Sequence, residues 1–446
     1  MRPAKLKLVE NRHDPLGSID YSDQASFHGQ SLLDKFRVQL PLIIITAIAA
    51  QIIFHYFFLG GYTFFQSQTS LNSIVVTTLA NVAGLLSYKR LRLFPGSRRM
   101  AFLIPAFGSS YIVLLIAILI ARIPYSNQQL FVGFATAIFL AWMFNVVARR
   151  PSAAPLMVVR SERTEAMISE LPQLSYQFCE RPIDIIGAQN GIVVDLRRDV
   201  PAEWEQAITK ATLAGTTIYH VKHIQESLTG RVQIDHLSEN SFGSLAPDSL
   251  YFALKNIVDR ISASFLLLVS LPILLIAAIA IKLDSPGPAI FKQRRIGYRG
   301  NPFIAYKLRT MINSDQNGKD RQSSITLDND PRITKLGRFL RKTRIDELPQ
   351  LVNVILGEMS LIGPRPEAEK LSEWYAESID FYAYRHVVLP GITGWAQVKQ
   401  GHVADTDEVY HKLQYDFYYI KHFSMWLDIM ITFKTVATIF NSKGAK

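Results

Sequence analysis

Four long runs of uncharged, mainly apolar residues in the first third of the chain constrain its fold more than any other feature. They cover residues 38–59, 71–88, 101–121 and 130–148, and each has 18 to 22 residues. An α-helix needs roughly 20 such residues to cross the hydrocarbon core of a bilayer. Asn72 and Asn81 interrupt the second run. We therefore predict a membrane protein with a four-helix transmembrane bundle at 36–150, after a tail at 1–35.

The charges beside these runs predict their orientation. The tail and the loop after the second run are rich in Lys and Arg, whereas residues 60–70 and 123–129 contain neither, and Arg149 and Arg150 follow the fourth run. Because such an excess marks the cytoplasmic side, we place both termini in the cytoplasm. We expect no cleavable signal sequence, since the first run begins beyond residue 35. The single cysteine, Cys179, excludes an intrachain disulfide and agrees with a cytosolic domain.

Residues 151–246 have the pattern of a small soluble α/β domain. Short runs rich in β-branched residues at 156–159, 183–186, 192–194 and 216–219 alternate with helix-like stretches at 162–170 and 201–214. This alternation predicts a parallel sheet. No G-x-G-x-x-G motif follows the first strand, so a dinucleotide site is not supported. We predict a degenerate Rossmann-like domain with a regulatory or packing role, with nucleotide binding as the alternative.

A fifth apolar stretch, 261–281, is long enough to span a membrane. Ser270 and Pro272 lie near its middle, where proline removes a backbone hydrogen bond and bends a helix. A crossing would carry the basic segment 282–446 outside, against the positive charge beside it. We therefore predict a re-entrant helix at about 255–284 that breaks at Ser270 and Pro272. A kinked true span is the alternative.

An acidic pair, Asp346 and Glu347, carries the strongest chemical signal. It lies between a cationic stretch and Arg365, which two prolines flank. Asp346 is a favourable N-cap and Pro349 is tolerated in a first turn, so we predict a helix start whose amides stabilise the ionised carboxylate. Such a layout suits an enzyme that handles phosphate, and an ordinary acidic helix cap is the plain alternative.

Positive charge is concentrated near that pair. Residues 282–344 contain 15 Lys and Arg against 5 Asp, a net of +10, when the whole chain carries +11. Phosphates and anionic lipid headgroups are the expected partners. Amphipathic helices at 332–344 and 425–440, the second with Trp426 as an anchor, are predicted to lie in the membrane interface. Nucleic acid is not expected, because no recognition motif accompanies the charge.

The C-terminal part of the chain resembles the monotopic phosphoglycosyl transferases, also called bacterial sugar transferases. The matching stretches, in unbroken order, are IKLDSPGPAIFKQRRIG from Ile281, YKLRTM from Tyr306, DPRITKLGRFLRKTRIDELPQL from Asp330, NVILGEMSLIGPRPE from Asn353 and LPGITGWAQV from Leu389. With four preceding spans, the chain is similar to the large form of this family, the undecaprenyl-phosphate glucose or galactose phosphotransferases.

The resemblance implies a mainly α catalytic domain at 247–446, on the cytoplasmic face of the bacterial inner membrane. It would transfer hexose-1-phosphate from a UDP-hexose to undecaprenyl phosphate and release UMP. The resemblance implies Asp346 as the nucleophile of a covalent phosphosugar intermediate, Glu347 as its partner, Mg²⁺ at this pair and Arg365 as a phosphate-binding residue. Membrane lipids and a second copy of the chain, as a homodimer, are further candidate partners.

Four more basic residues are weaker candidates for the donor and lipid phosphates: Lys307, Arg309, Arg332 and Arg341. Two other functions remain open. A membrane glycosyltransferase acting directly on a lipid acceptor would release UDP instead of UMP. An inactive scaffold would have no need of the Asp346–Glu347 pair or of the Pro-Arg-Pro turn, so both features argue against it.

Overall fold

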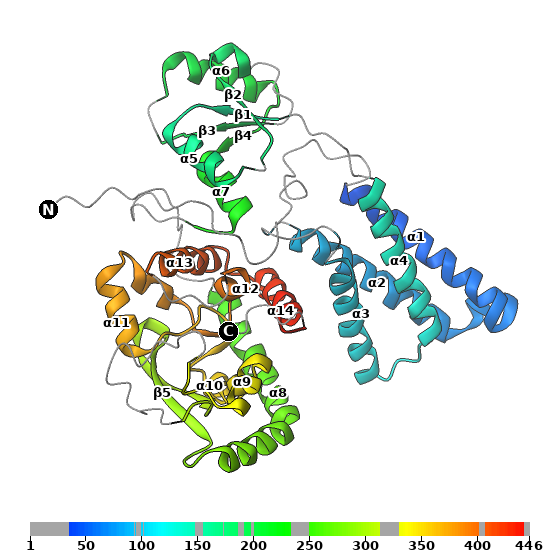
Figure 1. Cartoon of the computed structure of the whole chain (residues 1–446). Coiled ribbons are helices and arrows are strands. Elements are labelled where there is room, and N and C mark those ends of the chain that lie inside the picture. Colours follow the sequence, from blue (N-terminus) through cyan, green and yellow to red (C-terminus); the bar gives the residue numbers. More distant parts are fainter. Residues whose placement is uncertain are drawn as a thin grey trace. The chain divides into compact units, whose positions relative to one another are not determined.

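The computed structural model describes residues 35–92, 94, 100, 102–147, 155–172, 174–185, 191–197, 200–232, 249–312, 330–400 and 406–440. Of the predicted tail at 1–35, only Lys35 lies within the described residues. The described residues form two compact units (Figure 1). One contains residues 152–221, and the other contains residues 30–151 and 222–446.

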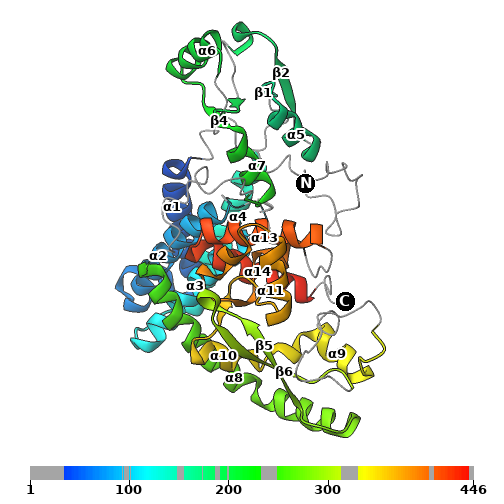
Figure 2. The same cartoon turned by 90° about the vertical axis from the view of Figure 1, so that its left-hand side faces the viewer.

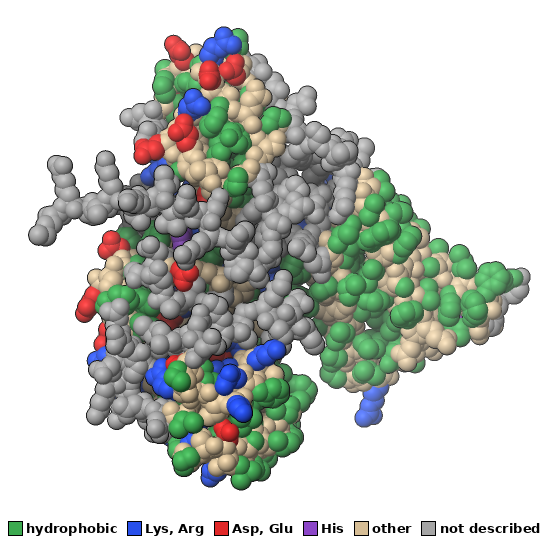
Figure 3. All heavy atoms as spheres, viewed as in Figure 1, with side chains coloured by type: hydrophobic (Ala, Val, Ile, Leu, Met, Phe, Trp, Pro, Cys, Tyr) green, Lys and Arg blue, Asp and Glu red, His purple; other side chains and the backbone are tan. Residues whose placement is uncertain are grey.

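The four predicted apolar runs are helices. Their bounds are Phe36–His55 (α1), Gln68–Leu91 (α2), Leu103–Ile120 (α3) and Asn127–Val147 (α4), and two short helical turns, Tyr56–Gly60 and Gly61–Gln66, follow α1. Apolar side chains make up much of the visible face of this bundle (Figure 3). Together with α8 (Ser249–Asp284), the described residues contain five helices long and apolar enough to cross a membrane. Arg122 lies between α3 and α4, immediately before the loop that the sequence marks as free of Lys and Arg.

Polar side chains inside the bundle bond one helix to the next. The Gln51 side chain donates to the Thr77 hydroxyl (2.7 Å) and to the Gln129 carbonyl (2.8 Å). Asn81, which interrupts the second apolar run, accepts a hydrogen bond from the Tyr111 hydroxyl (2.9 Å). In an apolar medium such bonds hold helices together, so these polar residues are compatible with a membrane-spanning bundle.

The smaller unit is an α/β domain with a parallel sheet, as predicted. Its strands are Leu156–Val159 (β1), Tyr176–Cys179 (β2), Ile192–Val194 (β3) and Ile218–His220 (β4), in the order β2-β1-β3-β4. The helices Glu162–Glu170 (α5) and Ala202–Leu213 (α6) connect strands. Val221–Thr229 (α7) follows β4, and from Lys222 on it belongs to the larger unit.

The predicted strand at 183–186 is wrong. That segment forms a short 3-10 turn, Pro182–Ile185, and β2 lies at 176–179 instead. Proline cannot donate to a sheet ladder, which favours a turn at this point. Ile185 is fully buried with Cys179 and Ile192. The apolar character of the segment therefore reflects packing against the sheet.

The C-terminal part of the larger unit is mainly α-helical, with short β elements. After α8 come a hairpin of Ile290–Ile296 (β5) and Pro302–Leu308 (β6), Lys335–Thr343 (α9), a 3-10 turn Ile345–Glu347 (η8), Gln350–Leu356 (α10), Ser360–Ile362 (β7), Glu369–Ser378 (α11), a 3-10 turn Tyr382–Val387 (η9), Gly391–Thr393 (β8), Trp395–Gln400 (α12), Thr406–Lys421 (α13) and Met425–Phe440 (α14). The antiparallel β5–β6 hairpin was not predicted. Figure 2 shows α10 beside this hairpin and α8.

Two parts of the long helix α8, one on each side of Pro272, pack against the same part of the protein. Before Pro272, Ala263 lies in a cluster with Phe303 and Ala305 of β6. Near its end, Ile281 packs with Leu308 of β6 and Leu340 of α9. Pro272 lies inside the helix, and α8 changes direction along its length (Figure 1). The side chains between the two contacts are largely exposed, including Leu268, Val269, Ile276 and Ile279.

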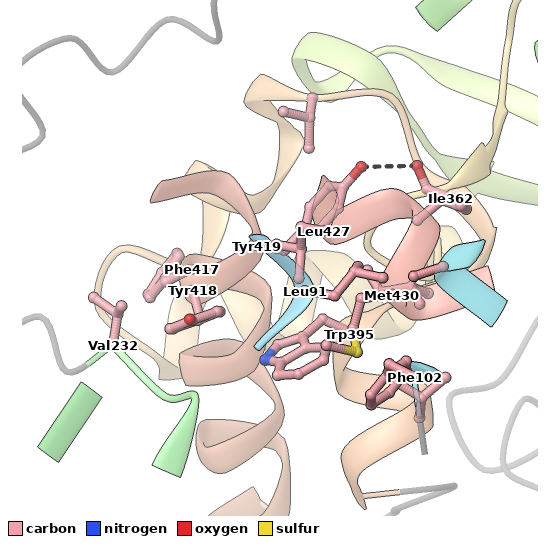
Figure 4. Packing of buried hydrophobic residues seen from close by; sticks show 14 of the residues in the cluster. Leu91, Phe102, Val232, Ile362, Trp395, Phe417, Tyr418, Tyr419, Leu427 and Met430 are labelled. Carbon is pink, nitrogen blue, oxygen red and sulfur yellow. Dashed lines mark hydrogen bonds between the residues drawn. The ribbon is translucent and has the colours of Figure 1, made fainter. Parts of the chain in front are cut away.

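Helix α14 has the predicted bounds, and one face of it packs against protein. Leu427, Met430 and Ile431 are fully buried. They lie in one cluster with Trp395 and Tyr419, whose hydroxyl donates to the Ile362 carbonyl (3.1 Å; Figure 4). Packing against protein therefore accounts for the buried face of α14, and its place in the membrane interface stays a prediction.

Candidate active site

The Asp346–Glu347 pair lies in a tight connection between α9 and α10. Arg344 has a left-handed backbone (φ 60°) that ends α9, and the turn η8 follows at once. Helix α10 begins only at Gln350, after Pro349. The prediction that Asp346 caps a helix is therefore wrong, because three residues separate it from the first helical position.

Glu347 is surrounded by cationic side chains. Its Oε1 lies 2.5 Å from Arg365 Nη2, 3.5 Å from Lys307 Nζ and 3.5 Å from Arg344 Nη1. Burial alone would raise the pKa of Glu347, but Arg365, Lys307 and Arg344 together hold it well below its usual range. Glu347 is therefore an ionised carboxylate that ties three separate elements together.

Asp346 is in a different state from its neighbour. It is only 7% exposed, and its Oδ1 atom has no hydrogen-bond partner in the described part of the chain. Burial and repulsion by Glu347 raise the pKa of Asp346, although Lys307, Arg365 and Arg341 oppose the rise. Because Asp346 does not cap α10, the cations Lys307, Arg365 and Arg341 are the groups that stabilise its carboxylate.

Two of the weaker candidates, Lys307 and Arg341, do lie at the pair. Burial and the nearby Arg365 lower the pKa of Lys307 to about 7, and the attraction of Glu347 opposes this. Arg341 donates its Nε to the Thr310 hydroxyl (2.9 Å) and interacts electrostatically with Asp346. A Cβ on Gly337 would lie 2.2 Å from the Thr310 carbonyl, so this glycine lets α9 carry Arg341 up to that strand end.

Arg309 and Arg332 make their hydrogen bonds with other partners. Arg309 is 8% exposed, and its guanidinium donates to the carbonyls of Ser285 (2.6 Å) and Pro286 (2.9 Å) after α8. Arg332 forms a bidentate ion pair with Asp330, in which its Nε and Nη2 atoms lie 2.6 to 3.1 Å from the carboxylate oxygens. The structure thus gives Arg309 a role in fixing the end of α8 and gives Arg332 a carboxylate partner of its own.

Other charged residues around the pair were not singled out from the sequence. Arg344 contacts Glu347, and Arg295 and Arg385 bind the backbone around Arg365. Glu367 contacts Lys412, and Asp416 lies 2.8 Å from Arg385. Arg295, Arg344 and Glu367 lie within the family-like stretches, but Lys412 and Asp416 come from α13, and nothing in the sequence brings that helix to the site.

Comparison with known proteins identifies the family of this chain. The protein-family model described as "Bacterial sugar transferase" matches residues 250–442. The chain is also 40% identical over 367 residues, 82% of its own length and 85% of the relative's, to the UDP-N-acetylgalactosamine-undecaprenyl-phosphate N-acetylgalactosaminephosphotransferase of Aeromonas hydrophila. The chain therefore belongs to the bacterial sugar transferase family.

Two other relatives match over shorter stretches. The UDP-glucose:undecaprenyl-phosphate glucose-1-phosphate transferase of Escherichia coli is 43% identical over 194 residues, which are 43% of this chain and 41% of the relative. The exopolysaccharide production protein PSS of Rhizobium leguminosarum is 41% identical over 192 residues, which are 42% of this chain and 94% of the relative. A segment of this size therefore makes up nearly a whole protein in one relative and less than half of another.

Proposed function

We propose that this membrane transferase moves a sugar-1-phosphate from a UDP-sugar to undecaprenyl phosphate and so initiates polysaccharide synthesis. The observation that carries the proposal is the buried Asp346–Glu347 pair enclosed by Lys307, Arg341 and Arg365. A pyrophosphate repels an attacking carboxylate unless fixed cations offset its charge. The names of the relatives supply the substrate classes.

In this reaction an Asp346 carboxylate oxygen bonds to the sugar-bearing phosphorus of the UDP-sugar. The bond from that phosphorus to the bridging oxygen breaks, and UMP leaves with the electron pair. An oxygen of undecaprenyl phosphate then attacks the same phosphorus and releases Asp346. Arg365, Lys307 and Arg341 would bind the phosphate oxygens, and Glu347 would hold Arg365 and Lys307 in place.

The relatives differ in the sugar that their names specify, which is N-acetylgalactosamine in one and glucose in another. The first of these matches extends over 82% of this chain and the second over 43%. We therefore propose UDP-N-acetylgalactosamine as the first substrate to test, before UDP-glucose and UDP-galactose. The test is to incubate the purified protein with each UDP-sugar and undecaprenyl phosphate and to measure UMP. Release of UDP instead would identify a direct glycosyltransferase, and absence of any product would favour a scaffold.

A magnesium ion fits this site. The Asp346 oxygen without a partner is buried, and Mg²⁺ is commonly held by one or two carboxylates together with substrate phosphates. No group of three His, Cys, Asp or Glu residues in the described ranges could hold a metal, so substrate oxygens would complete the shell. Both Glu347 oxygens contact Arg365, which makes Glu347 the weaker ligand. When bound, the ion would offset charge on the donor pyrophosphate.

Removal of divalent metal is expected to stop the reaction. Excess EDTA should abolish UMP release, because the cationic side chains alone leave the pyrophosphate and Asp346 insufficiently neutralised. Added Mg²⁺ should restore it, and EDTA preloaded with Mg²⁺ serves as the matched control. Full activity in excess metal-free EDTA would show that the arginines and Lys307 suffice.

We further propose that α8 is re-entrant, with its break at Ser270 and Pro272, and that four helices form the spanning bundle. Ala263 and Ile281 both pack against β6, yet a straight helix would separate them by about 27 Å. A hydrocarbon core is about 30 Å thick, so a crossing helix would put these two contacts on opposite sides. One domain cannot meet both unless α8 returns to the side it entered from.

Labelling of single cysteines tests this topology. Ala253→Cys, before the apolar part of α8, and Asn301→Cys, between β5 and β6, are both exposed positions and should label from the cytoplasmic side. Gln128→Cys, at the start of α4, is the control expected on the outer side. The native Cys179 is buried and gives little background. Labelling of the first two positions from opposite sides would exclude a re-entrant helix.

A further inference from the structure

The turn that carries Arg365 is held by its backbone. Each carbonyl oxygen of residues 364–367 accepts a hydrogen bond, and the four donors are the Gly391 N–H (2.9 Å), Arg385 Nη2 (2.8 Å), Arg295 Nη1 (2.5 Å) and the Ile296 N–H (3.2 Å). Pro364 and Pro366 have no N–H of their own to offer. The position of the turn is thus set from outside, by two backbone amides and two arginines.

Arg385 is the more deeply fixed of these arginines. It is 3% exposed, and its Nη2 lies 2.8 Å from Asp416, which is 1% exposed. Its Nη1 donates to the Tyr382 hydroxyl (2.8 Å) and lies 4.0 Å from Glu367. A buried guanidinium is costly unless it is paired, and the Asp416 carboxylate supplies that pairing, although Arg385 Nε has no hydrogen-bond partner among the described residues.

The remaining contact of Arg385 links it to the candidate active site. Its Nη2 reaches the carbonyl of Arg365, whose own guanidinium binds Glu347 at 2.5 Å. Asp416 on α13 is thereby connected, through two arginines in series, to the carboxylate beside the proposed nucleophile. The fork of a guanidinium bonds in two directions at once, which a lysine ammonium on a flexible stem does poorly.

We propose that Arg385, oriented by Asp416 and Tyr382, is a positioning residue for the transfer reaction. It holds the backbone at Arg365 so that the Arg365 guanidinium stays against Glu347 and the donor phosphates. Arg385 acts through Arg365 and not on the reacting atoms. This inference rests on the proposed function, in which Arg365 binds a phosphate of the donor.

The first test is a double-mutant cycle. In Arg385→Lys the buried positive charge beside Asp416 is kept, and the guanidinium fork that contacts Asp416, Tyr382 and the Arg365 carbonyl together is lost. We expect kcat for UMP release to fall about 10- to 100-fold, with KM for the UDP-sugar changed less than about threefold. In an Arg365→Lys background the same change should cost little more, because the residue it positions is already altered. If the reductions in kcat caused by the two substitutions multiply in the double variant, or if Arg385→Lys keeps full activity, the proposal is overturned.

The second test does not depend on activity. Hydrogen exchange of the full chain in detergent should be faster in Arg385→Lys at the amides of Gly363 and Gly391, which bond around the turn. The control is Lys421→Gln, which breaks an ion pair from α13 to the buried Glu226 (2.7 Å) away from this turn. It should leave both these amides and kcat unchanged. Equal exchange in Arg385→Lys and the native protein would contradict the positioning role, even if no sugar substrate were found.

A third variant covers the case in which Arg385→Lys fails to fold. Tyr382→Phe removes only the hydroxyl that holds Nη1, so it keeps the buried charges paired. It should lower kcat by a smaller factor, again without further loss in the Arg365→Lys background. A Tyr382→Phe protein with native kcat and native exchange at Gly391 would remove the support for Arg385 as a positioning residue.

Discussion

Asp346→Asn is expected to abolish both the covalent intermediate and turnover. The amide is nearly isosteric with the carboxylate but neutral and poorly nucleophilic, so attack on phosphorus should slow by at least about 1000-fold, or about 4 kcal/mol of transition-state stabilisation. The substitution also leaves the fold intact in principle, since Asp346 Oδ1 makes no hydrogen bond among the described residues.

Mass spectrometry after incubation with UDP-sugar, without undecaprenyl phosphate, provides the measurement. The native protein should gain the mass of a sugar phosphate on the peptide that contains Asp346 and release one equivalent of UMP. The matched control is Asp195→Asn, a buried aspartate of the smaller unit whose Oδ1 lies 3.8 Å from His220 Nε2. It should still form the adduct. An adduct that persists in Asp346→Asn, or that maps to another residue, would favour a different nucleophile or direct attack by the lipid phosphate.

The sequence predicted most of what depends on local pattern. Apolar length alone located the four helices of the bundle, and β-branched runs located β1 and β3. The predicted strand at 183–186 failed because a buried Ile185 in a turn has the same apolar signature as a strand residue. The β5–β6 hairpin was missed because β5 contains Lys292, Arg294 and Arg295. These charges were interpreted as a cationic surface, and not as part of a strand.

At the candidate site, too, the sequence predicted the features that depend on composition and missed those that depend on distant residues. The composition around Asp346 and Arg365 indicated phosphate chemistry, and the structure does bring Lys307 and Arg341 to the pair. Local rules misplaced Asp346 as a helix cap, because the left-handed Arg344 starts a 3-10 turn that residue preferences do not reveal. The different roles of Arg309 and Arg385 could not be predicted from the sequence. Both are buried arginines, and their roles depend on the distant carbonyls that they bind.

Glu347→Gln is expected to slow the reaction and to move its pH dependence. Glu347 is the shared partner of Arg365, Lys307 and Arg344, and a neutral amide offsets none of their charge. Loss of preorganised charge at this site should lower kcat by about 100-fold. Some adduct should still form, because the attacking oxygen of Asp346 is untouched.

The direction of the pH shift follows from the two neighbouring groups. Glu347 raises the pKa of Lys307, so without it that pKa falls below its present value of about 7, and the ammonium is lost at lower pH. Glu347 also raises the pKa of Asp346, so the carboxylate ionises at lower pH in the variant. Both limbs of kcat/KM against pH should therefore move to lower pH, and the deficit should be larger at pH 8 than at pH 6.

A matched charge change elsewhere distinguishes this effect from a general one. Glu369→Gln removes a carboxylate that pairs with the exposed Arg294 at 3.0 Å, and it should leave both limbs unchanged. If the limbs of Glu347→Gln stay at their native pH values, then Glu347 does not set the protonation of Lys307 and Asp346. Its contacts with the three cations would then serve only to hold β6, η8 and the Arg365 turn together.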